Sequence, residues 1–527
     1  MHVTIDGKEV IRFMTLAYQS PLFYAIFLPV VMVIYQCMPK KYRWLVLLLA
    51  NYAFFFVWSK GLLLYNIITT LITFFVGMKL GNMKKAPQGV DKKVFKKKKK
   101  RILVITVLIN LGVLVVLKYT NFIGGTVMGL LGGSFTPLHI LVPLGISYYT
   151  LQNISYLSDV SNKKIEATHN FFHLSLYNTF FPTIMEGPIT RYGDVSPALL
   201  SGQAISYESL TVGFQRIIWG LFKKMIIADH LAPVVNNLFS ASYIENGALC
   251  LLAAILCTIQ LYMDFAGTID IGIGAAKVFN VTLAENFRQP FYAKNAGDFW
   301  RRWHITLGAF FRDYIFYPVS LSKPIQKLTK WTHNHLGKMA ARYIGPMIAL
   351  LLVWLANGFW HGPYWTYVFY GLYYFVLLFV EMLGEKPFEE FCNKHHINMD
   401  GTGMKVFRFV KLFFIVIIGE MFFRAETIQV GFTMFMNIFT NFKLGDAIAT
   451  IPFLGMDQWD WIVVIVCFAI VCVVSYMKEN QISIRGKLNA MPMMMRWSIF
   501  YALIFAVILF GAYGPGYDAV AMMYAGF

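Results

Sequence analysis

Residues 84–117 read KKAPQGVDKKVFKKKKKRILVITVLINLGVLVVL, in which a strongly basic segment runs directly into an apolar one. The apolar part, residues 102–117, is continuous and shows none of the alternation that a membrane β-strand would need. Inside a bilayer only helices and closed barrels satisfy every backbone hydrogen bond. This stretch therefore predicts a membrane helix with a basic segment at one end.

Apolar runs of this kind recur along the whole chain of 527 residues, of which 57% are hydrophobic and 14% charged. Because soluble proteins carry about a quarter charged residues, the composition favours one large integral-membrane domain over several soluble domains. The other runs that cross, or nearly cross, a hydrocarbon core are residues 22–35, 44–57, 62–76, 248–261, 344–354, 367–380, 410–418, 462–474 and 499–510. The sequence predicts an all-α polytopic membrane protein with roughly 10–13 transmembrane helices.

The basic segment also predicts the orientation of the chain. Residues 84–101 carry ten lysines and arginines and one aspartate, which is +9 of the formal net charge of +19. Basic loops between membrane helices lie in the cytoplasm, and the short basic loop at residues 40–43 falls on the same face because it lies two helices earlier. We expect a multi-pass plasma-membrane protein with an extracellular N-terminus, a polar lead at residues 1–19 and a single membrane domain at residues 20–527. No aromatic platform is interleaved with the lysines, so an orientation signal or a contact with anionic lipid is favoured over nucleic-acid binding.

The six cysteines give no sign of a disulfide framework or a metal site. Most lie inside apolar runs, and the sequence contains neither a Cys-x-x-Cys pair nor a cysteine–histidine spacing of the kind that binds zinc. The sequence therefore predicts no bound metal.

Residues 286–318, NFRQPFYAKNAGDFWRRWHITLGAFFRDYIFYP, interrupt this hydrophobic chain with four arginines, a lysine, two aspartates and a histidine. Charged groups near hydrocarbon are costly, so such an insertion is typical of a functional pocket. A helix over residues 298–312, N-capped by Asp298, would place five residues on one face: Trp300, Trp303, His304, Leu307 and Phe311.

In that helix His304 points into the protein together with the tryptophans. Arg301, Arg302 and Arg312 lie off the face and are free to reach headgroups or an anionic ligand. The alternative is an amphipathic helix in the membrane interface, with an aromatic belt and snorkelling arginines.

A second polar interruption, Asn357-Gly358-Phe359-Trp360-His361-Gly362, stands in the middle of an apolar stretch. The glycines and the following Pro363 predict a helix that is weakened or broken there. Non-helical backbone at membrane depth is tolerated only inside protein or beside a watery cavity. A histidine in such a place is able to accept a proton near pH 7. The alternative for His361 is a structural histidine bonded to a carbonyl group.

Two neutral histidines in a membrane cavity, with neither a Ser-His-Asp order nor a metal cluster, favour acyl transfer from a thioester to a hydroxyl. The thioester is already activated, so the reaction needs a base for the hydroxyl proton and donors for the oxyanion. His361 is the expected base. His304, or a donor near it, would position the substrate or stabilise charge.

Asp264 and Asp270 follow an apolar run but lie six residues apart, so they do not share a helix face. Gly267, Gly272 and Gly274 predict close helix packing or a break. A structural role for the aspartates, such as orienting an arginine or a histidine, stays open beside a catalytic one.

These motifs resemble the membrane-bound O-acyltransferase family, in particular its bacterial branch of alginate and polysaccharide O-acetylation proteins. The residues that carry the resemblance are LVPLGISYYTLQNISYLSDV (141–160), EGPITRY (186–192), YMDFAGTIDIGIG (262–274), ENFRQPF (285–291), DFWRRWHITL (298–307), RDYIFYP (312–318), WHG (360–362) and GAYGPGYDAV (511–520). In this resemblance His361 matches the near-invariant histidine of the family and His304 its second conserved one.

The resemblance implies re-entrant or interfacial helices around a central cavity, with residues 285–362 as the catalytic segment. The expected supporting residues are Trp300, Arg301, Arg302, Trp303, Asn357, Trp360, Asp264, Asp270, Arg312 and Asp313. It also implies an acyl thioester such as acetyl-CoA as donor, with no permanently bound cofactor. The implied partners are an SGNH-type extracytoplasmic acetyltransferase and polysaccharide synthase machinery.

The chain departs from the family pattern at two positions. Tyr374 stands where many relatives have another histidine, and Thr268 where the branch usually has tyrosine. These departures bear on the acceptor more than on the chemistry. D-alanyl transfer to teichoic acid is the second function that the resemblance allows, ranked second because those close relatives tend to be shorter and to lack the DIGIG-like segment (270–274). A membrane transporter, which also uses broken helices and buried histidines, and a non-catalytic scaffold remain as alternatives from other classes.

Overall fold

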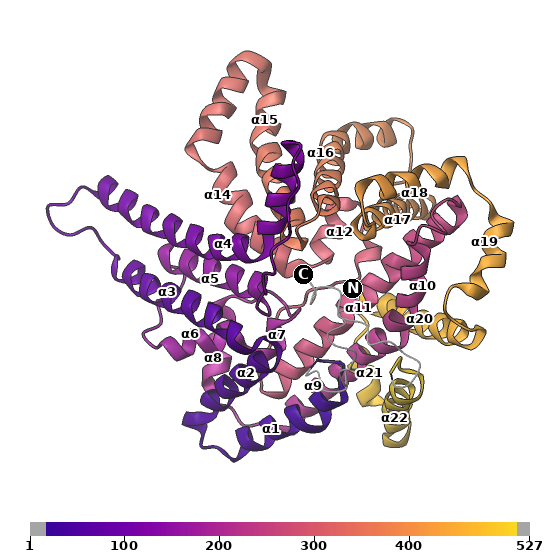
Figure 1. Cartoon of the computed structure of the whole chain (residues 1–527), viewed down its shortest axis with the longest axis horizontal. Coiled ribbons are helices and arrows are strands. Elements are labelled where there is room, and N and C mark those ends of the chain that lie inside the picture. The colour runs from indigo at the N-terminus through magenta and orange to yellow at the C-terminus, as the bar shows by residue number, and fades with distance from the viewer. Residues whose placement is uncertain (1–16, 514–527) are drawn as a thin grey trace. The chain divides into compact units, whose positions relative to one another are not determined.

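The computed structural model describes residues 17–513, which form helices joined by short connections and contain no β-strand (Figure 1). This confirms the all-α fold class. Most of the predicted polar lead, and most of the tail motif at 511–520, lie outside the described residues.

By length and composition, seven helical stretches within the described residues suffice to cross a membrane: Lys40–Asn82, Lys92–Leu130, Gly247–Val278, Lys323–His361, Trp365–Lys394, Gln458–Glu479 and Met493–Phe510. Three shorter apolar helices accompany them: Phe23–Cys37, Ile428–Thr440 and Leu444–Phe453.

The number of stretches is smaller than the 10–13 helices expected, for two physical reasons. Lys40–Asn82 contains two successive helices, α2 (Arg43–Ser59) and α3 (Leu63–Asn82), joined by a short 3-10 turn. The predicted run at 410–418 belongs to α17 (Thr402–Arg424), whose charged residues flank the apolar centre.

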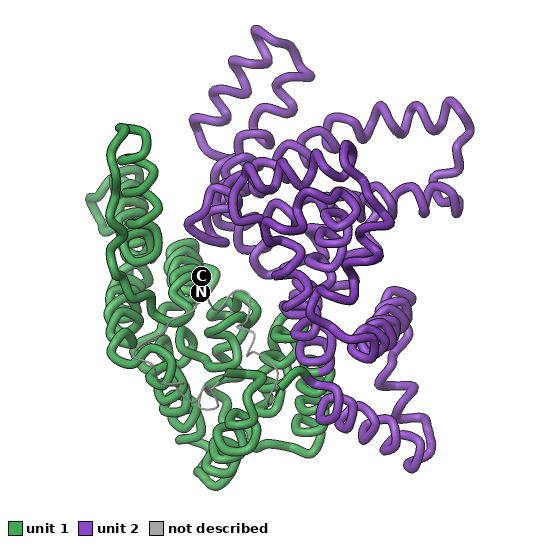
Figure 2. The backbone as a smooth tube through the Cα atoms, turned by 45° about the vertical axis from the view of Figure 1, so that its right-hand side comes forward, with its two compact units in different colours: residues 1–221, 267–284, 512–526 green, residues 222–266, 285–511, 527 purple. Residues whose placement is uncertain are grey.

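The chain divides into two compact units, which Figure 2 colours separately. Among the described residues, unit 1 holds 17–221, 267–284 and 512–513, and unit 2 holds 222–266 and 285–511. The single membrane domain at 20–527 stays a prediction.

Unit 1 contains the N-terminal helices and the end of one long helix. Its elements are η2 (Phe23–Phe27), α1 (Leu28–Cys37), η3 (Lys40–Tyr42), α2, η4 (Lys60–Leu62), α3, α4 (Lys92–Leu130), α5 (Ile146–Ser161), α6 (Phe171–Thr179), α7 (Phe181–Ile184), α8 (Tyr192–Ser201), α9 (Tyr207–Leu221) and the last part of α11 (Gly247–Val278).

The basic segment differs from the expected loop. Helix α4 begins at Lys92, inside residues 84–101, because the Asp91 carboxylate caps it by accepting a hydrogen bond from the Lys93 backbone N–H at 2.5 Å. Lysine is a good helix former, so the run of lysines continues as helix into the apolar stretch. Only residues 83–91 form a non-helical connection.

Helix α5 is buried along almost its whole length. Its Asn153 lies at the centre of a polar network in unit 1. The Asn153 amide donates to Asn110 Oδ1 on α4 at 3.1 Å and accepts from Asn178 Nδ2 on α6 at 2.7 Å. Asn178 also donates to Thr70 Oγ1 on α3 at 3.0 Å. These bonds join four helices where polar groups in hydrocarbon would otherwise lack partners.

Unit 2 contains the remaining helices, including both candidate histidines. Its elements are η5 (Phe222–Ala228), α10 (Asp229–Leu238), the first part of α11, η6 (Pro290–Tyr292), α12 (Ala296–Arg302), α13 (Ile305–Phe311), η7 (Arg312–Phe316), α14 (Tyr317–Ser320), α15 (Lys323–His361), α16 (Trp365–Lys394), α17, α18 (Ile428–Thr440), α19 (Leu444–Thr450), η8 (Ile451–Phe453), α20 (Gln458–Glu479), α21 (Ile484–Ala490) and α22 (Met493–Phe510).

Helices α15 and α16 pack closely at two glycines. A Cβ atom on Gly358 would lie 2.4 Å from the backbone oxygen of Tyr367, and one on Gly371 would lie 2.3 Å from that of Trp354. Both distances are too short for any side chain, so the two helices approach here because the glycines have none.

Candidate active site

His304 lies at a break between two short helices, where one continuous helix was expected over residues 298–312. Helix α12 ends at Arg302, and His304 adopts left-handed backbone angles (φ 46°, ψ 50°) before α13 begins. The N-cap is Asn295, whose side chain accepts from the Asp298 backbone N–H at 2.7 Å, and not Asp298 as expected. The prediction of a single helical face was therefore wrong, although Trp303 and His304 are both buried at 3% exposure.

Asn286 determines which nitrogen of His304 carries the proton. Its Oδ1 accepts from the Thr306 backbone N–H at 3.1 Å and from Thr306 Oγ1 at 2.9 Å, and it lies 3.2 Å from His304 Nδ1. An atom that faces a backbone N–H must be the oxygen, so His304 Nδ1 must donate to it. His304 Nε2 is then the unprotonated nitrogen.

The Nε2 atom of His304 is buried and has no hydrogen-bond partner among residues 17–513. Burial lowers the pKa of His304 from 6.5 to about 3, because a charged imidazole would lose its solvation there. The ring is therefore neutral at physiological pH and presents a free lone pair.

His361 is the last residue of α15. The helix was expected to weaken or break around His361; it stays regular through Gly358 and ends at His361, with the extended Gly362 as its C-cap before Pro363. The non-helical residue within α15 is Gly337 instead, because glycine readily adopts its positive φ of 86°. His361 is buried at 4% exposure.

Aromatic rings surround His361. Its ring centroid lies 5.1 Å from that of Phe423, 5.8 Å from Tyr370 and 6.2 Å from Tyr367. Trp360 joins the two histidines, since its ring lies 5.4 Å from His304 and 5.1 Å from His361. The structure thus brings His304 together with the neighbouring residues Trp360 and His361, which lie far from it in the sequence.

Trp300, on α12, packs against residues of α15 and α16. Its ring lies 4.7 Å from both Trp354 and Tyr374, and Tyr374 is fully buried. Trp354, Asn357 and His361 share one face of α15 over two turns. Tyr374, where the family pattern often has histidine, therefore packs into the aromatic wall of the same site.

The buried polar atoms of this region that lack a hydrogen-bond partner within the described part of the chain include these four: Asn286 Nδ2, Trp300 Nε1, His304 Nε2 and Asn357 Oδ1. A buried polar group without a partner costs about 1–3 kcal/mol. Two are donors and two are acceptors, so the set suits a ligand with both kinds of group, such as a hydroxyl or a thioester carbonyl.

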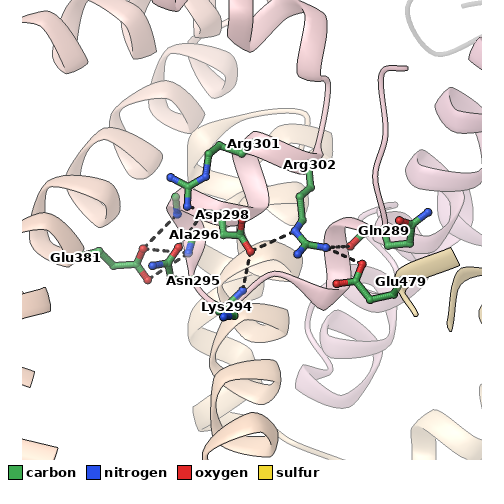
Figure 3. A network of polar contacts seen from close by, with 10 residues as sticks. Gln289, Lys294, Asn295, Ala296, Asp298, Arg301, Arg302, Glu381 and Glu479 are labelled. Atoms are coloured by element: carbon green, nitrogen blue, oxygen red, sulfur yellow. Dashed lines mark hydrogen bonds and ion pairs between the residues drawn. The ribbon is translucent and has the colours of Figure 1, made fainter. Parts of the chain in front are cut away.

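The three arginines that were expected to reach an anionic ligand form ion pairs within the protein. Figure 3 shows Arg302 bound to the carboxylates of Asp298, at 3.2 Å, and Glu479, at 2.8 Å. Arg301 contacts Asp298 at 3.6 Å and is 73% exposed, while Arg312 pairs with its neighbour Asp313 at 2.8 Å. The expectation that Arg302 is free for an anionic ligand was wrong, because two carboxylates already neutralise it.

The same network fixes the start of α12 (Figure 3). The Glu381 carboxylate accepts from the backbone N–H groups of Ala296, at 3.0 Å, and Gly297, at 3.3 Å. It also pairs with Lys411 at 3.0 Å. A carboxylate at a helix N-terminus is favoured by the unpaired N–H groups and the helix dipole. This anchors the helix that carries Trp300.

Asp264 and Asp270 form ion pairs in different units. In unit 2, Asp264 lies 2.8 Å from Lys224 Nζ, which also contacts Asp229 at 2.5 Å, and all three side chains are almost fully buried. In unit 1, Asp270 lies 2.6 Å from Arg216. Both contacts agree with the structural alternative. The glycine prediction is confirmed in unit 1, where a Cβ on Gly274 would lie 2.6 Å from the backbone oxygen of Gly213.

Two residues near the histidines were missed from the sequence. Asn286 belongs to the ENFRQPF motif, but nothing in its spacing indicates a bond to His304. Glu420 lies in α17 and is fully buried, and its carboxylate accepts from the hydroxyl of Tyr370 at 3.0 Å. A glutamate in an apolar helix was the available signal, since charged groups in such helices are rare and mark functional sites.

Known acyltransferases are similar in sequence to this chain over most of its length. Residues 141–332, which include His304, match the profile of the MBOAT, membrane-bound O-acyltransferase family. The chain is 30% identical over 430 residues to the probable alginate O-acetylase AlgI of Pseudomonas aeruginosa, covering 81% of this chain and 75% of that protein. It is 28% identical over 452 residues to the peptidoglycan O-acetyltransferase of Helicobacter pylori, covering 80% and 79%. It is also 31% identical over 251 residues to the teichoic acid D-alanyltransferase of Bacillus subtilis, covering 46% and 60%.

Proposed function

We propose that this chain, which belongs to the membrane-bound O-acyltransferase family and is an integral-membrane O-acyltransferase, passes acetyl groups from a cytoplasmic thioester donor toward hydroxyls of an exported cell-surface polysaccharide. The donor we propose is acetyl-CoA. The observation that carries the proposal is the buried pair of histidines joined by Trp360, one of them with an unprotonated nitrogen that has no partner in the described chain.

In the proposed reaction the acceptor hydroxyl oxygen attacks the thioester carbonyl carbon. His361 takes the hydroxyl proton, the new C–O bond forms, and the C–S bond breaks. The proton then passes from His361 to the leaving thiolate, so the products are an O-acetyl ester and a free thiol. The indole N–H of Trp300 and the amide N–H of Asn286 are the buried donors available to the carbonyl oxygen as it becomes negative.

His304 acts beside this base as a neutral acceptor. Its Nε2 atom accepts a hydrogen bond from a hydroxyl of the acceptor other than the one that His361 deprotonates, and so orients the acceptor for attack, because Asn286 holds the proton on Nδ1. The proposal includes an SGNH-type extracytoplasmic acetyltransferase and polysaccharide synthase machinery as partners in the later steps of transfer.

Acetyl transfer is favoured over D-alanyl transfer by the extent of the similarity. The match to the alginate O-acetylase covers 81% of this chain, whereas the match to the D-alanyltransferase covers 46%. The longer match supports acetyl as the group carried.

The experiment is acetyl transfer by the purified protein in liposomes with acetyl-labelled acetyl-CoA. We expect His361→Ala to lower transfer by about 10²–10⁴-fold, the usual contribution of a general base. His335→Ala is the matched control, since His335 lies exposed on the same helix and should leave transfer unchanged. Full transfer by His361→Ala would refute the base role, and unchanged donor crossing the bilayer would identify a transporter instead.

A further inference from the structure

Unit 1 carries an apolar groove, with a volume of about 540 Å³, between the segment η2–α1 and helix α2. Every residue that lines it is apolar or aromatic. The volume falls within the range of about 300–1,000 Å³ that is usual for ligand pockets. The groove is separate from the candidate active site, which lies in unit 2.

The lining residues show that the groove runs along the helices. On the first segment they recur every four residues, from Leu22 through Ile26, Val30 and Ile34 to Met38, which is one face of a helix. The 16 residue-to-residue steps from Leu22 to Met38 extend about 24 Å at the rise of a helix. A single leaflet takes about half of the roughly 30 Å hydrocarbon core, so the groove is long enough for a lipid acyl chain.

Small residues on α2 make the hollow. Ala50 and Ala53 lie on the groove between larger neighbours, while Ile26, Leu49 and Val57 on its walls are 56%, 60% and 52% exposed. A larger side chain at Ala53 would therefore fill the groove.

One end of the groove is basic. Met38 and Tyr42 line that end, and the exposed Lys40 and Lys41 lie in the turn between them. Residues 17–90 contain no aspartate or glutamate, so no carboxylate in this part of the sequence neutralises the two lysines.

The neighbouring Arg43 is already engaged. Its guanidinium donates to the backbone oxygens of Met38, Gly202 and Gln36, at 3.1, 3.0 and 3.4 Å. The arginine therefore holds the shape of the turn. Lys40 and Lys41 stay exposed, and Lys41 Nζ lies 4.7 Å from the centre of the Tyr42 ring at the end of the groove.

From this charge complementarity we propose that the groove binds an anionic phospholipid, with an acyl chain along η2, α1 and α2 and its phosphate headgroup at Lys40 and Lys41. A basic cluster beside an apolar groove attracts a negatively charged headgroup and apolar chain together. A zwitterionic lipid would place an acyl chain in the groove in the same way, but its headgroup carries no net charge to attract the lysines.

The test is lipid retention by the purified full-length protein in detergent, measured by native mass spectrometry with phosphatidylglycerol and phosphatidylcholine of the same chain length. Wild type should retain phosphatidylglycerol preferentially. Each lysine near an anionic headgroup contributes roughly fivefold in affinity. The Lys40→Gln/Lys41→Gln double variant should therefore bind phosphatidylglycerol about 25-fold more weakly.

Two further variants separate the headgroup from the chain. Ala53→Phe should weaken both lipids alike, because it fills the groove and leaves the lysines in place. Lys60→Gln is the matched control, since Lys60 is exposed at the opposite end of α2 and should change nothing. Equal retention of both lipids by wild type, an unchanged Ala53→Phe variant, or the same loss in Lys60→Gln as in the double variant would each overturn the proposal.

Discussion

At the scale of single residues, the backbone of His304 explains why the site was only partly visible in the sequence. Its left-handed conformation costs a non-glycine residue about 1–2 kcal/mol. Two backbone bonds across the break offset this cost, from Ile305 N to Asn286 O at 3.0 Å and from Arg288 N to Arg302 O at 2.9 Å. The histidine itself was identified from its position among aromatic and basic residues. The two backbone bonds made by residues 286 and 288 are tertiary contacts, which no local sequence pattern predicts.

Asn286 should affect the rate of transfer more than substrate binding. Asn286→Ala removes the acceptor that holds the His304 proton on Nδ1, so the ring loses its fixed tautomer and orientation. Misplacing a catalytic group by about 1 Å costs roughly 100-fold, and we expect kcat to fall by that factor with KM little changed. Asn286→Asp keeps an acceptor and should recover part of the rate. A rise in KM alone, measured in the liposome assay, would contradict the positioning role.

The free energy of unfolding at acid pH should depend on His304. Burial lowers its pKa from 6.5 to about 3, so between these values the unfolded chain binds a proton that the folded chain does not. Stability therefore rises with pH across this window and is lost as the pH falls below 6.5, by about 2 kcal/mol at pH 5.

Thermal unfolding in detergent at pH 7.5 and pH 5.0 measures this effect. Wild type should lose a few degrees more in Tm than His304→Gln over the same interval, because glutamine does not titrate. Equal losses in the two proteins would show that His304 takes up its proton while the protein is still folded.

At the scale of elements, the close packing of α15 and α16 places His361 beside the aromatic rings of α16. Gly371→Ala should drive a methyl group into the backbone oxygen of Trp354, at 2.3 Å, and lower the free energy of unfolding by about 1–3 kcal/mol. Gly384→Ala on the same helix is the control, since its Cβ would meet nothing within 4 Å. We expect lower Tm and lower transfer for Gly371→Ala alone, and equal behaviour of the two variants would contradict the packing argument.

The elements themselves were predictable to different degrees. Continuous apolar runs predicted the long helices, because a chain in hydrocarbon has to satisfy its own backbone. In helix α15 the glycine pattern was misinterpreted. The glycine at 358 was interpreted as a weak point, but it serves close contact with Tyr367, and the helix bends at Gly337 instead. A glycine needed for packing and a glycine needed for a bend look alike in a single sequence.

At the scale of the whole molecule, the distribution of charge predicts an orientation. Ten of the 46 lysines and arginines fall between residues 84 and 101, and the turn with Lys40 and Lys41 lies two predicted membrane helices earlier. Both should therefore face the cytoplasm. The headgroup end of the lipid groove then lies in the cytoplasmic leaflet, where anionic lipids create a negative surface potential.

Cys37 offers a direct measurement of this orientation. It is exposed and stands three residues before Lys40, and Cys472 is the other exposed cysteine among the described residues. In a Cys472→Ala variant, a membrane-impermeant maleimide should label Cys37 in inverted membrane vesicles and leave it unlabelled in intact spheroplasts. Cys37→Ser/Cys472→Ala should take up no label in either preparation. Labelling of Cys37 in intact spheroplasts would place the basic turn outside, and with it reverse the predicted direction from which the acyl donor enters.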